Sequence, residues 1–358
     1  MKLLFSINSN VSGGAERVMI TLANHFADNG HSVCLLNFDK NSSFYNVSRN
    51  VSLIKIGDKY NINPSSNKFF KNLKIRKCVH KEISSFKPDI VVPFLFDSEL
   101  FCIPYCCLHR INCVASVRND AKSYPWYQRL FRKHFFRKIA GVVFQSEAVA
   151  SFKDFKRIHH STVIYNPLSI DIQERSGVDF YKIISVGRLN KQKNHKLLIE
   201  AISRLVSKYP KIHLHIFGDG ELKTELIEYA RSLNVSSHVF LEGSIKDAIV
   251  KNNDAQLFIM PSNYEGFPNA LLEAMAAHIP VVSTSFESGT ADFLIGNNER
   301  GFLFNVGDVG ALVSIIDYSF SNRAVVEEKG DKASKFCSQF NCESIANQWN
   351  AFFRRVIK

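Results

Sequence analysis

Two glutamates frame the start of a predicted helix in the segment EGFPNALLE, which covers residues 265 to 273. The run AQLFIMP just before it is typical of a buried strand, so a polar loop should lead from strand into helix. Carboxylates in such a loop accept hydrogen bonds from hydroxyl groups, which a sugar would offer. Glu265 and Glu273 are therefore candidate ligand-binding residues. The alternative is that Glu273 merely lies in the helix and Glu265 caps it.

The first turn of the same helix is a candidate anion site. Gly266 lets the backbone come close to a ligand, and Pro268 suits the first turn of a helix. Backbone N–H groups at the start of a helix have no acceptor within the helix and favour negative charge. The N–H groups expected to face a diphosphate belong to Phe267, Asn269, Ala270 and Leu271.

Cations follow another strand-like run, Tyr181 to Gly187. Arg188 and Lys193 come shortly after it, and a guanidinium together with an ammonium point charge would neutralise a diphosphate. The alternative interpretation is a basic loop exposed to solvent.

Glycines mark two further strand ends. Gly13 and Gly14 open a predicted helix, which suits the close approach of an anion but equally suits a tight turn. Gly218 begins a Gly-x-Gly turn that lacks the third glycine of the dinucleotide fingerprint, so a nicotinamide cofactor is not supported. We expect Gly218 to line a crevice.

The elements that must position these residues alternate between strand and helix. Helical stretches such as 16–29, 195–208 and 269–278 separate short apolar runs, and this alternation predicts parallel sheets covered on both faces. Ligands bind such sheets at the carboxyl ends of the strands. The runs predicted as strands are KLLFSI, HSVCLLNF, VSLIKI, DIVVPF, NCVASV, GVVFQ, YKIISVG, KIHLHIF, HVFLEG, AQLFIM, IPVVST and GFLF.

Two domains are expected, because 358 residues exceed the size of one ordinary hydrophobic core. The strand pattern restarts after a polar stretch near residues 166 to 180. We therefore predict an α/β fold of two doubly wound, Rossmann-like domains facing across a cleft. Their predicted bounds are 1–170 and 171–340, with a C-terminal helix at 341–358 that crosses back to the first domain.

Positive charge is concentrated in the first half of the chain. Residues 1 to 170 contain 24 Lys and Arg against 11 Asp and Glu, whereas residues 171 to 358 contain 21 against 22. Lys68 to Lys81 and Lys122 to Ile139 combine aromatic and basic side chains, which suits an anionic bilayer surface. The alternative is that their aromatic side chains enter the core. The residues assigned to the acceptor or membrane are Arg17, Trp126, Arg129, Arg132, Lys133 and Arg137.

The sequence has no apolar run of 18 or more residues, and its N-terminus lacks the pattern of a cleaved signal. We expect a cytoplasmic protein, peripheral on the inner face of the cell membrane. The cysteines at 102, 106, 107 and 113 form a cluster without paired C-x2-C knuckles, so we favour core packing over zinc binding.

The EGFPNALLE segment closely resembles the E-x7-E motif of retaining glycosyltransferase family 4, whose fold is GT-B. The segments GGAER and GRLNKQKN are similar to the same family, and the resemblance covers nearly the whole chain. It extends to bacterial enzymes that assemble O-antigen lipopolysaccharide, capsule and N-glycans. The resemblance implies a nucleotide-sugar donor, no cofactor, and an acceptor sugar carried on undecaprenyl diphosphate.

By that likeness, Arg188 and Lys193 bind the donor diphosphate, Glu265 contacts the transferred sugar, and Glu273 holds the ribose. No Asp-x-Asp sequence is present to hold a bridging metal, and these cations supply positive charge themselves, so we expect no metal requirement. Retention in the family implies displacement on one face of the sugar, with the departing phosphate helping to deprotonate the acceptor hydroxyl.

By the same likeness, Gly14 lies near the sugar and phosphates and Gly218 borders the base. Where many relatives have a histidine, this chain has Arg118, which stays protonated and cannot act as a general base. We expect it to stabilise phosphate charge instead. Alternatively, it is a structural residue paired with Asp97 or Asp120. The residues expected to take part in catalysis are Arg118, Arg188, Lys193 and Glu265.

Among donors we favour a UDP-N-acetylhexosamine, with GalNAc ahead of GlcNAc. UDP-glucose, UDP-galactose and GDP-mannose are alternatives, and a nucleotide-sugar hydrolase or epimerase would use the same architecture. An alternative from a different functional class is a basic protein that binds nucleic acid or a membrane without catalysis. The chain contains no RNA- or DNA-binding motif, so we expect no nucleic-acid partner.

Overall fold

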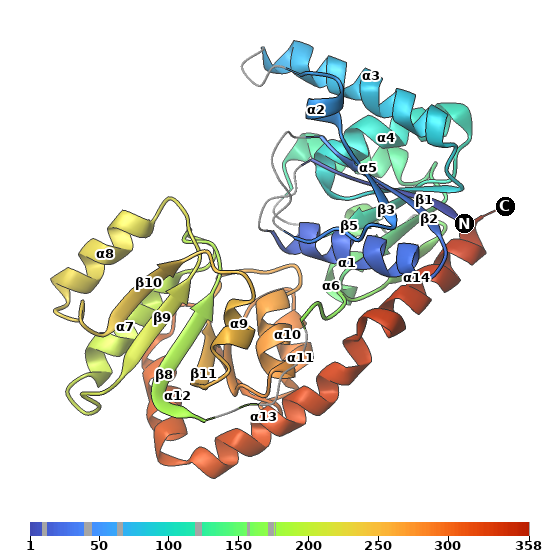
Figure 1. The fold of residues 1–358 in the computed structure, drawn as a ribbon. Coiled ribbons are helices and arrows are strands. Elements are labelled where there is room, and N and C mark those ends of the chain that lie inside the picture. The colour runs from blue at the N-terminus through green and yellow to red at the C-terminus, as the bar shows by residue number, and fades with distance from the viewer. Residues whose placement is uncertain are drawn as a thin grey trace. The chain divides into compact units, whose positions relative to one another are not determined.

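The computed structural model describes residues 1–8, 13–38, 45–62, 67–118, 124–155, 158–170, 175 and 177–357. The chain forms two compact units (Figure 1). Unit 1 comprises residues 1–169 together with 340–358, and unit 2 comprises residues 170–339. Within the described ranges, every helix is too short or too polar to span the hydrocarbon core of a bilayer.

Unit 1 is built on parallel strands. One sheet has the order β3-β2-β1-β4 and a second has the order β5-β6-β7. Parallel bridges from Val91 to Cys113 and from Phe94 to Ser116 join β4 to β5, so the second sheet continues the first. The strands are β1 (Lys2–Ile7), β2 (Ser32–Asn37), β3 (Val51–Lys55), β4 (Ile90–Pro93), β5 (Val114–Val117), β6 (Gly141–Phe144) and β7 (Ser161–Val163).

Helices connect β1 to β2 and each pair of successive strands from β3 to β7, as is typical of parallel pairing. All residues of β4, β5 and β6 are buried, which explains why their sequences are apolar except for Ser116. The helices of unit 1 are α1 (Gly14–Asp28), α2 (Ile56–Lys59), α3 (Lys68–Phe86), α4 (Leu95–His109), α5 (Trp126–Phe135), α6 (Glu147–Ala150) and α14 (Cys342–Val356).

Unit 2 has one parallel sheet of six strands in the order β10-β9-β8-β11-β12-β13. The strands are β8 (Asp179–Val186), β9 (His213–Phe217), β10 (Val239–Gly243), β11 (Ala255–Met260), β12 (Val281–Ser285) and β13 (Phe302–Asn305). The helices are α7 (His195–Leu205), α8 (Lys223–Ser232), α9 (Ala248–Lys251), α10 (Asn269–Ala276), α11 (Thr290–Ile295), α12 (Val309–Ser321) and α13 (Arg323–Cys337).

The last helix, α14, packs in unit 1 although it follows unit 2 in sequence. Its Trp349 stacks on Phe94 with ring centroids 6.4 Å apart, and its Phe353 lies 5.9 Å from Phe26 of α1. The Leu168 N–H donates a hydrogen bond of 2.7 Å to the carbonyl oxygen of Phe340. The segments at which the chain leaves and re-enters unit 1 therefore lie side by side.

The fold class predicted from the sequence is confirmed: both units are doubly wound parallel α/β structures. All twelve runs predicted as strands form strands, and β7 is an additional strand of three residues. The cysteine cluster also behaves as predicted. Cys102, Cys106 and Cys113 are free thiols buried in the hydrophobic core of unit 1, where burial raises the pKa of Cys102 and Cys113.

Candidate active site

The predicted donor-site residues lie on two loops at the carboxyl edge of the sheet of unit 2. Arg188 and Lys193 follow β8, and Glu265 follows β11. Because β8 and β11 are adjacent strands, the two loops are neighbours. The strand order also reverses at this point, because β9 and β11 pair with opposite sides of β8. Ligands of open α/β sheets bind where the strand order reverses.

Hydrogen bonds join the two loops. The Asn263 N–H donates to the Gln192 carbonyl at 2.8 Å, and the Asn263 side-chain amide donates to the Lys191 carbonyl at 2.7 Å. In return, the Gln192 side chain donates to the Tyr264 carbonyl at 2.9 Å. These reciprocal bonds hold the loop after β8 against the loop after β11.

An ion pair closes the contact between the loops. Lys193 Nζ lies 2.6 Å from Glu265 Oε1, and the two side chains are only 18% and 10% exposed. Ser262 Oγ donates to the same carboxylate oxygen at 2.8 Å, and Gln192 Nε2 donates to Oε2 at 3.3 Å. Glu265 is thus held by three donors, and the charge of Lys193 is neutralised within the site.

Arg188 differs from Lys193 because it is exposed. Among the described residues, no carboxylate forms an ion pair with it. The aliphatic chain of Lys193 packs over Gly187, where a Cβ would lie 2.9 Å from Lys193 Cδ. Arg188 is therefore an exposed cation with no ion pair among the described residues, and it lies on the same loop as the paired Lys193.

Helix α10 begins at Asn269, as the sequence predicts, but its first turn offers fewer donors than expected. The Asn269 N–H donates to the Phe267 carbonyl at 3.1 Å, so the prediction that this group is free to face an anion is wrong. Ala270 is half-buried, whereas Leu271 and Phe267 are buried. The α10 donors that remain candidates for an anion are the N–H groups of Ala270 and Leu271.

The other residues of this motif lie around the same helix start. Gly266 is half-buried in the loop before α10, and Glu273 lies in the second turn, where it is 7% exposed. Glu265, by contrast, lies in the loop itself. Their spacing places them separately, one on the loop and one on the helix.

Gly218 is required by packing. Its φ is +147°, and a Cβ there would overlap the carbonyl oxygen of Gly187, while a Cβ on Gly220 would overlap that of Leu189. The loop after β9 is bonded to the loop after β8 through Gly187 N–H to Phe217 O, 2.9 Å, and Leu189 N–H to Asp219 O, 3.0 Å. The Gly-x-Gly turn thus supports the loop that carries Arg188.

His195, the first residue of α7, is the histidine nearest to this site in sequence. It is 2% exposed, and desolvation, with a smaller effect from Lys193, lowers its pKa to about 3. A histidine with so low a pKa is a poor proton acceptor at neutral pH.

In unit 1, Gly13 and Gly14 open α1 at the carboxyl edge of the sheet, next to β1. A Cβ on Gly13 would overlap the carboxylate of Glu16, so this carboxylate folds back over the start of the helix. Arg17 is half-buried and donates to the Ser169 carbonyl at 2.9 Å. Arg17 therefore joins α1 to the end of unit 1, and its assignment to the acceptor or membrane stays a prediction.

Arg118 lies directly after β5, at the same edge of unit 1. It is buried, with Nε donating to Ser116 Oγ at 2.6 Å and Nη1 donating to Asn166 Oδ1. Asp97 forms no ion pair with it, and Asp120 lies outside the described residues. Sequence analysis missed Asn166, because 48 residues separate it from Arg118 and only the fold brings them together.

The basic helix α5 is divided between core and surface. Arg132 is 2% exposed and forms a two-pronged ion pair with Glu99, at 2.7 and 3.1 Å, so its assignment to the membrane or acceptor is wrong. Arg129 pairs with Asp154 at 2.6 Å. Trp126 is 76% exposed, and Lys133 and Arg137 are also exposed.

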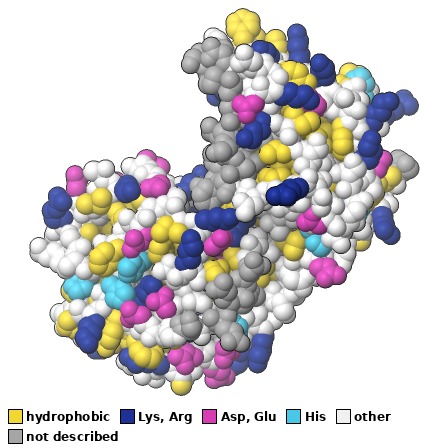
Figure 2. Space-filling view, viewed as in Figure 1, with side chains coloured by type: hydrophobic (Ala, Val, Ile, Leu, Met, Phe, Trp, Pro, Cys, Tyr) yellow, Lys and Arg dark blue, Asp and Glu magenta, His cyan; other side chains and the backbone are white. Residues whose placement is uncertain are grey.

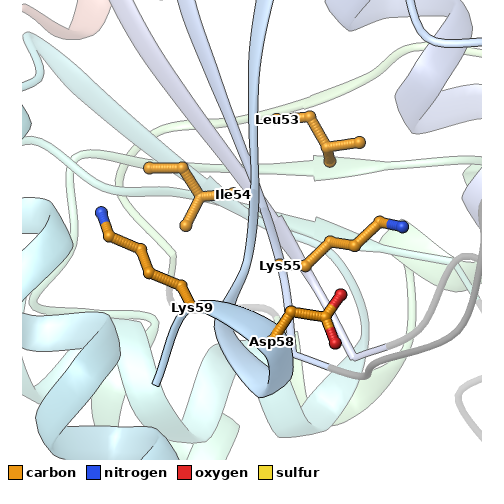
Figure 3. A pocket seen from close by; sticks show the side chains of 5 residues that line it. All are labelled: Leu53, Ile54, Lys55, Asp58 and Lys59. Carbon is orange, nitrogen blue, oxygen red and sulfur yellow. The ribbon is translucent and has the colours of Figure 1, made fainter. Parts of the chain in front are cut away.

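Two surface depressions lie in unit 1. One, of about 280 Å³, is lined by Trp126, Arg129, Leu130, Lys133 and Asp154, and so includes three residues assigned to the acceptor or membrane. The other, of about 300 Å³, lies where β3 meets α2 and is lined by Leu53, Ile54, Lys55, Asp58 and Lys59 (Figure 3). It contains none of the residues singled out by the sequence.

Comparisons with known proteins agree with this architecture. Residues 12–172 match the family model of glycosyltransferase family 4, and residues 170–336 match that of the glycosyl transferases group 1. HepE of Anabaena, solved in complex with UDP, is similar in fold, with a TM-score of 0.75 at 18% identity over 99% of this chain and 100% of that one. The fold is GT-B, and the chain belongs to the group 1 and family 4 glycosyltransferases.

Two curated relatives extend the comparison. An uncharacterized glycosyltransferase of Methanocaldococcus jannaschii is 30% identical over 253 residues, which are 63% of this chain and 62% of that protein. An α-1,4-N-acetyl-D-galactosaminyltransferase of Campylobacter jejuni is 25% identical over 356 residues, which are 98% of this chain and 97% of that protein. Its name gives the acceptor as GalNAc-α-(1→4)-GalNAc-α-(1→3)-diNAcBac-PP-undecaprenol.

The packing at Gly218 predicts a cost for any side chain there. We expect Gly218→Ala to lower the free energy of unfolding by about 2 kcal/mol, because the methyl group collides with the Gly187 carbonyl at a positive φ. Gly310→Ala in α12 is the control, since its Cβ would meet Asp308 at an ordinary 3.5 Å. Urea denaturation followed by far-ultraviolet circular dichroism measures both. Equal stability of Gly218→Ala and the wild type would contradict the packing argument.

Proposed function

We propose that this glycosyltransferase transfers an N-acetylhexosamine, with GalNAc favoured, from a UDP donor onto a sugar carried by undecaprenyl diphosphate. The product would serve bacterial O-antigen or other surface polysaccharide synthesis. Support comes from the Campylobacter relative, which matches over nearly its whole length and whose name gives both a GalNAc transfer and an undecaprenol-linked acceptor. HepE, whose fold is similar, binds UDP.

The observation that carries the proposal is the pairing of Lys193 with Glu265 beside the exposed Arg188. A donor has an anionic diphosphate and an uncharged sugar with several hydroxyl groups. Arg188 would meet the diphosphate first, and Lys193 would exchange its carboxylate partner for a phosphate oxygen. Glu265, released from Lys193, would then accept hydrogen bonds from the sugar. Glu273 is assigned to the ribose.

The same residues account for the chemistry that we propose. The bond between the anomeric carbon and the phosphate oxygen breaks, while the acceptor oxygen bonds to the same face of the sugar, which gives retention. In this proposal the acceptor proton passes to the departing phosphate. Burial lowers the pKa of His195 to about 3, which makes this histidine a poor proton acceptor. Arg188 and Lys193 neutralise the charge that grows on the leaving group, so transfer should not require a metal ion.

A panel of donors tests the proposal. We expect UDP-GalNAc or UDP-GlcNAc to raise the melting temperature more than UDP-glucose, UDP-galactose or GDP-mannose. With the favoured donor, mass spectrometry should show one added N-acetylhexosamine on a prenyl-diphosphate-linked sugar, and EDTA should leave the rate unchanged. Release of free sugar without an acceptor product would instead identify a hydrolase.

Variants of the loop after β8 connect the reaction to the site. Arg188→Ala and Lys193→Ala should each weaken UDP binding by roughly 10-fold or more and lower turnover, because each removes a charged hydrogen bond to phosphate. Lys191→Ala is the control, since Lys191 lies exposed on the same loop. If Lys191→Ala lost as much UDP affinity and turnover as the other two variants, the losses would reflect the net charge of the loop and not specific contacts with the diphosphate.

We also propose that unit 1 docks on the anionic inner face of the cell membrane. At the start of α3, the exposed Phe69, Phe70 and Leu73 lie among lysines at 68, 71, 74 and 77 (Figure 2). The first acidic residue of α3, Glu82, is buried and pairs with Lys59 at 2.6 Å. Each Lys or Arg near an anionic membrane surface contributes about 1 kcal/mol to the free energy of membrane binding. On α5, Trp126 and Lys133 are likewise exposed, so this helix also presents an aromatic and a basic side chain to solvent.

Vesicle binding tests the membrane proposal. Phe69→Ala with Phe70→Ala should lower co-sedimentation with phosphatidylglycerol vesicles severalfold, because two exposed aromatic side chains no longer enter the interface. Ile227→Ala is the control, since Ile227 is an exposed apolar residue of α8 in unit 2. Equal binding to neutral phosphatidylcholine vesicles, or stronger binding to oligonucleotides, would contradict the proposal.

A further inference from the structure

Arg118 is the centre of a buried cluster formed by residues of unit 1 alone. Its guanidinium lies between two aromatic rings, with Cζ 5.1 Å from the ring centre of Phe94 and 5.5 Å from that of Trp349. Ser116 Oγ and Asn166 Oδ1 accept two of its hydrogen bonds. Its partners thus come from the ends of β4 and β5, the segment after β7, and helix α14.

The positive charge of Arg118 has no counter-ion in this cluster. Both oxygens that accept from it are neutral, and no carboxylate among the described residues forms an ion pair with it. Desolvation lowers the pKa of Arg118 to about 9, and no acidic group offsets this effect. Arg132 in the same unit shows the contrast, since it is equally buried but Glu99 balances its charge. A buried cation without a counter-ion lowers the stability of the folded state.

Three hydrogen-bond donors in this region have no acceptor. Arg118 Nη2, Gln145 Nε2 and Trp349 Nε1 are each buried and unpartnered. Val117 pairs with Phe144 across β5 and β6, so Arg118 and Gln145 follow at the same level of the sheet. Trp349 reaches this level from α14, where it is fully buried against Arg118. An anion bound here would accept hydrogen bonds from these donors and neutralise the charge of Arg118.

The position of the cluster fits a ligand site. Arg118 and Gln145 each follow a parallel strand directly, and open α/β sheets bind ligands at this edge. We propose that Arg118, Gln145 and Trp349 form a phosphate-binding site in unit 1, formed independently of the cations of unit 2. This inference rests on the proposed function, because that reaction offers two phosphate sources, the lipid diphosphate of the acceptor and the diphosphate of the donor.

Variants at Arg118 separate binding from structure. Arg118→Met keeps an unbranched chain between the two rings and removes the charge. We expect it to weaken phosphate binding roughly 10-fold or more while leaving the melting temperature unchanged or higher, because an uncompensated buried charge is lost. Arg118→Lys should restore only part of the affinity, since an ammonium lacks the planar fork. A falling melting temperature with unchanged binding would overturn the proposal.

Trp349→Phe tests the contribution of α14. The substitution keeps an aromatic ring beside Arg118 and deletes only the N–H donor, so about a fivefold loss of affinity is expected. Arg354→Met is the matched control, because Arg354 is an exposed arginine of the same helix, α14. Full affinity in Trp349→Phe would show that Trp349 serves packing alone and would remove it from the site.

The probes are UDP and farnesyl diphosphate, each titrated calorimetrically into the full-length wild type and the variants. A loss confined to farnesyl diphosphate assigns the site to the acceptor, and a loss confined to UDP assigns it to the donor; either result supports a phosphate site. Wild-type affinity for both probes in Arg118→Met refutes it, even if sugar transfer is intact. A wild-type protein that binds neither probe would refute the proposed function itself.

Discussion

The ion pair between Lys193 and Glu265 is the contact on which the arrangement of the candidate donor site depends. It joins the loops after two adjacent strands, β8 and β11, and its atoms are 2.6 Å apart. Removing two charges largely from water is costly, and here Ser262 and Gln192 repay part of that cost by donating to the same carboxylate. Without the pair, a carboxylate and an ammonium would each be left partly buried without compensation.

The pair also determines how the site can respond to a donor. With Lys193 neutralised, the exposed Arg188 is the predicted diphosphate ligand on this loop that has no ion pair among the described residues. Under the proposed function, a diphosphate would compete with Glu265 for Lys193, and the released carboxylate would become available to the sugar. The binding of phosphate and the recognition of sugar would thus be coupled through one exchange of partners. The steric fit of Gly218 against Gly187 keeps the supporting loop in register for this exchange.

Three arginines of unit 1 show that the role of a cation depends on its burial and its ion-pair partners, which composition does not reveal. Arg129 is half-exposed and paired, so it contributes little net charge to the surface. Arg132 is fully buried and balanced by Glu99. Arg118 is buried without a counter-ion, which is costly for a structural residue and therefore suggests a ligand. In the sequence, Arg129 and Arg132 are equivalent members of one basic helix.

Much of the fold follows from the sequence, because strands buried on both faces are apolar along their whole length. β7 was missed since Ser161–Val163 is too short to form such a pattern. The E-x7-E segment and the cations after β8 were also assigned to one site, and the structure brings Lys193 and Glu265 of these segments into contact. Local patterns cannot reveal Asn166 and Trp349 beside Arg118, because tertiary packing brings these residues together from distant segments. Arg132 was misassigned because helical periodicity does not show which neighbouring helix supplies a buried Glu99.

The separate roles of Lys193 and Glu265 in donor binding can be measured directly by titrating UDP and UDP-GalNAc into the wild type and Glu265→Gln. If Glu265 recognises the sugar and Lys193 the diphosphate, Glu265→Gln should bind UDP at least as tightly as the wild type, because Lys193 is no longer held by a carboxylate. The same variant should lose the additional affinity that the sugar confers on UDP-GalNAc. Equal weakening of both ligands, or no change in either, would contradict the account.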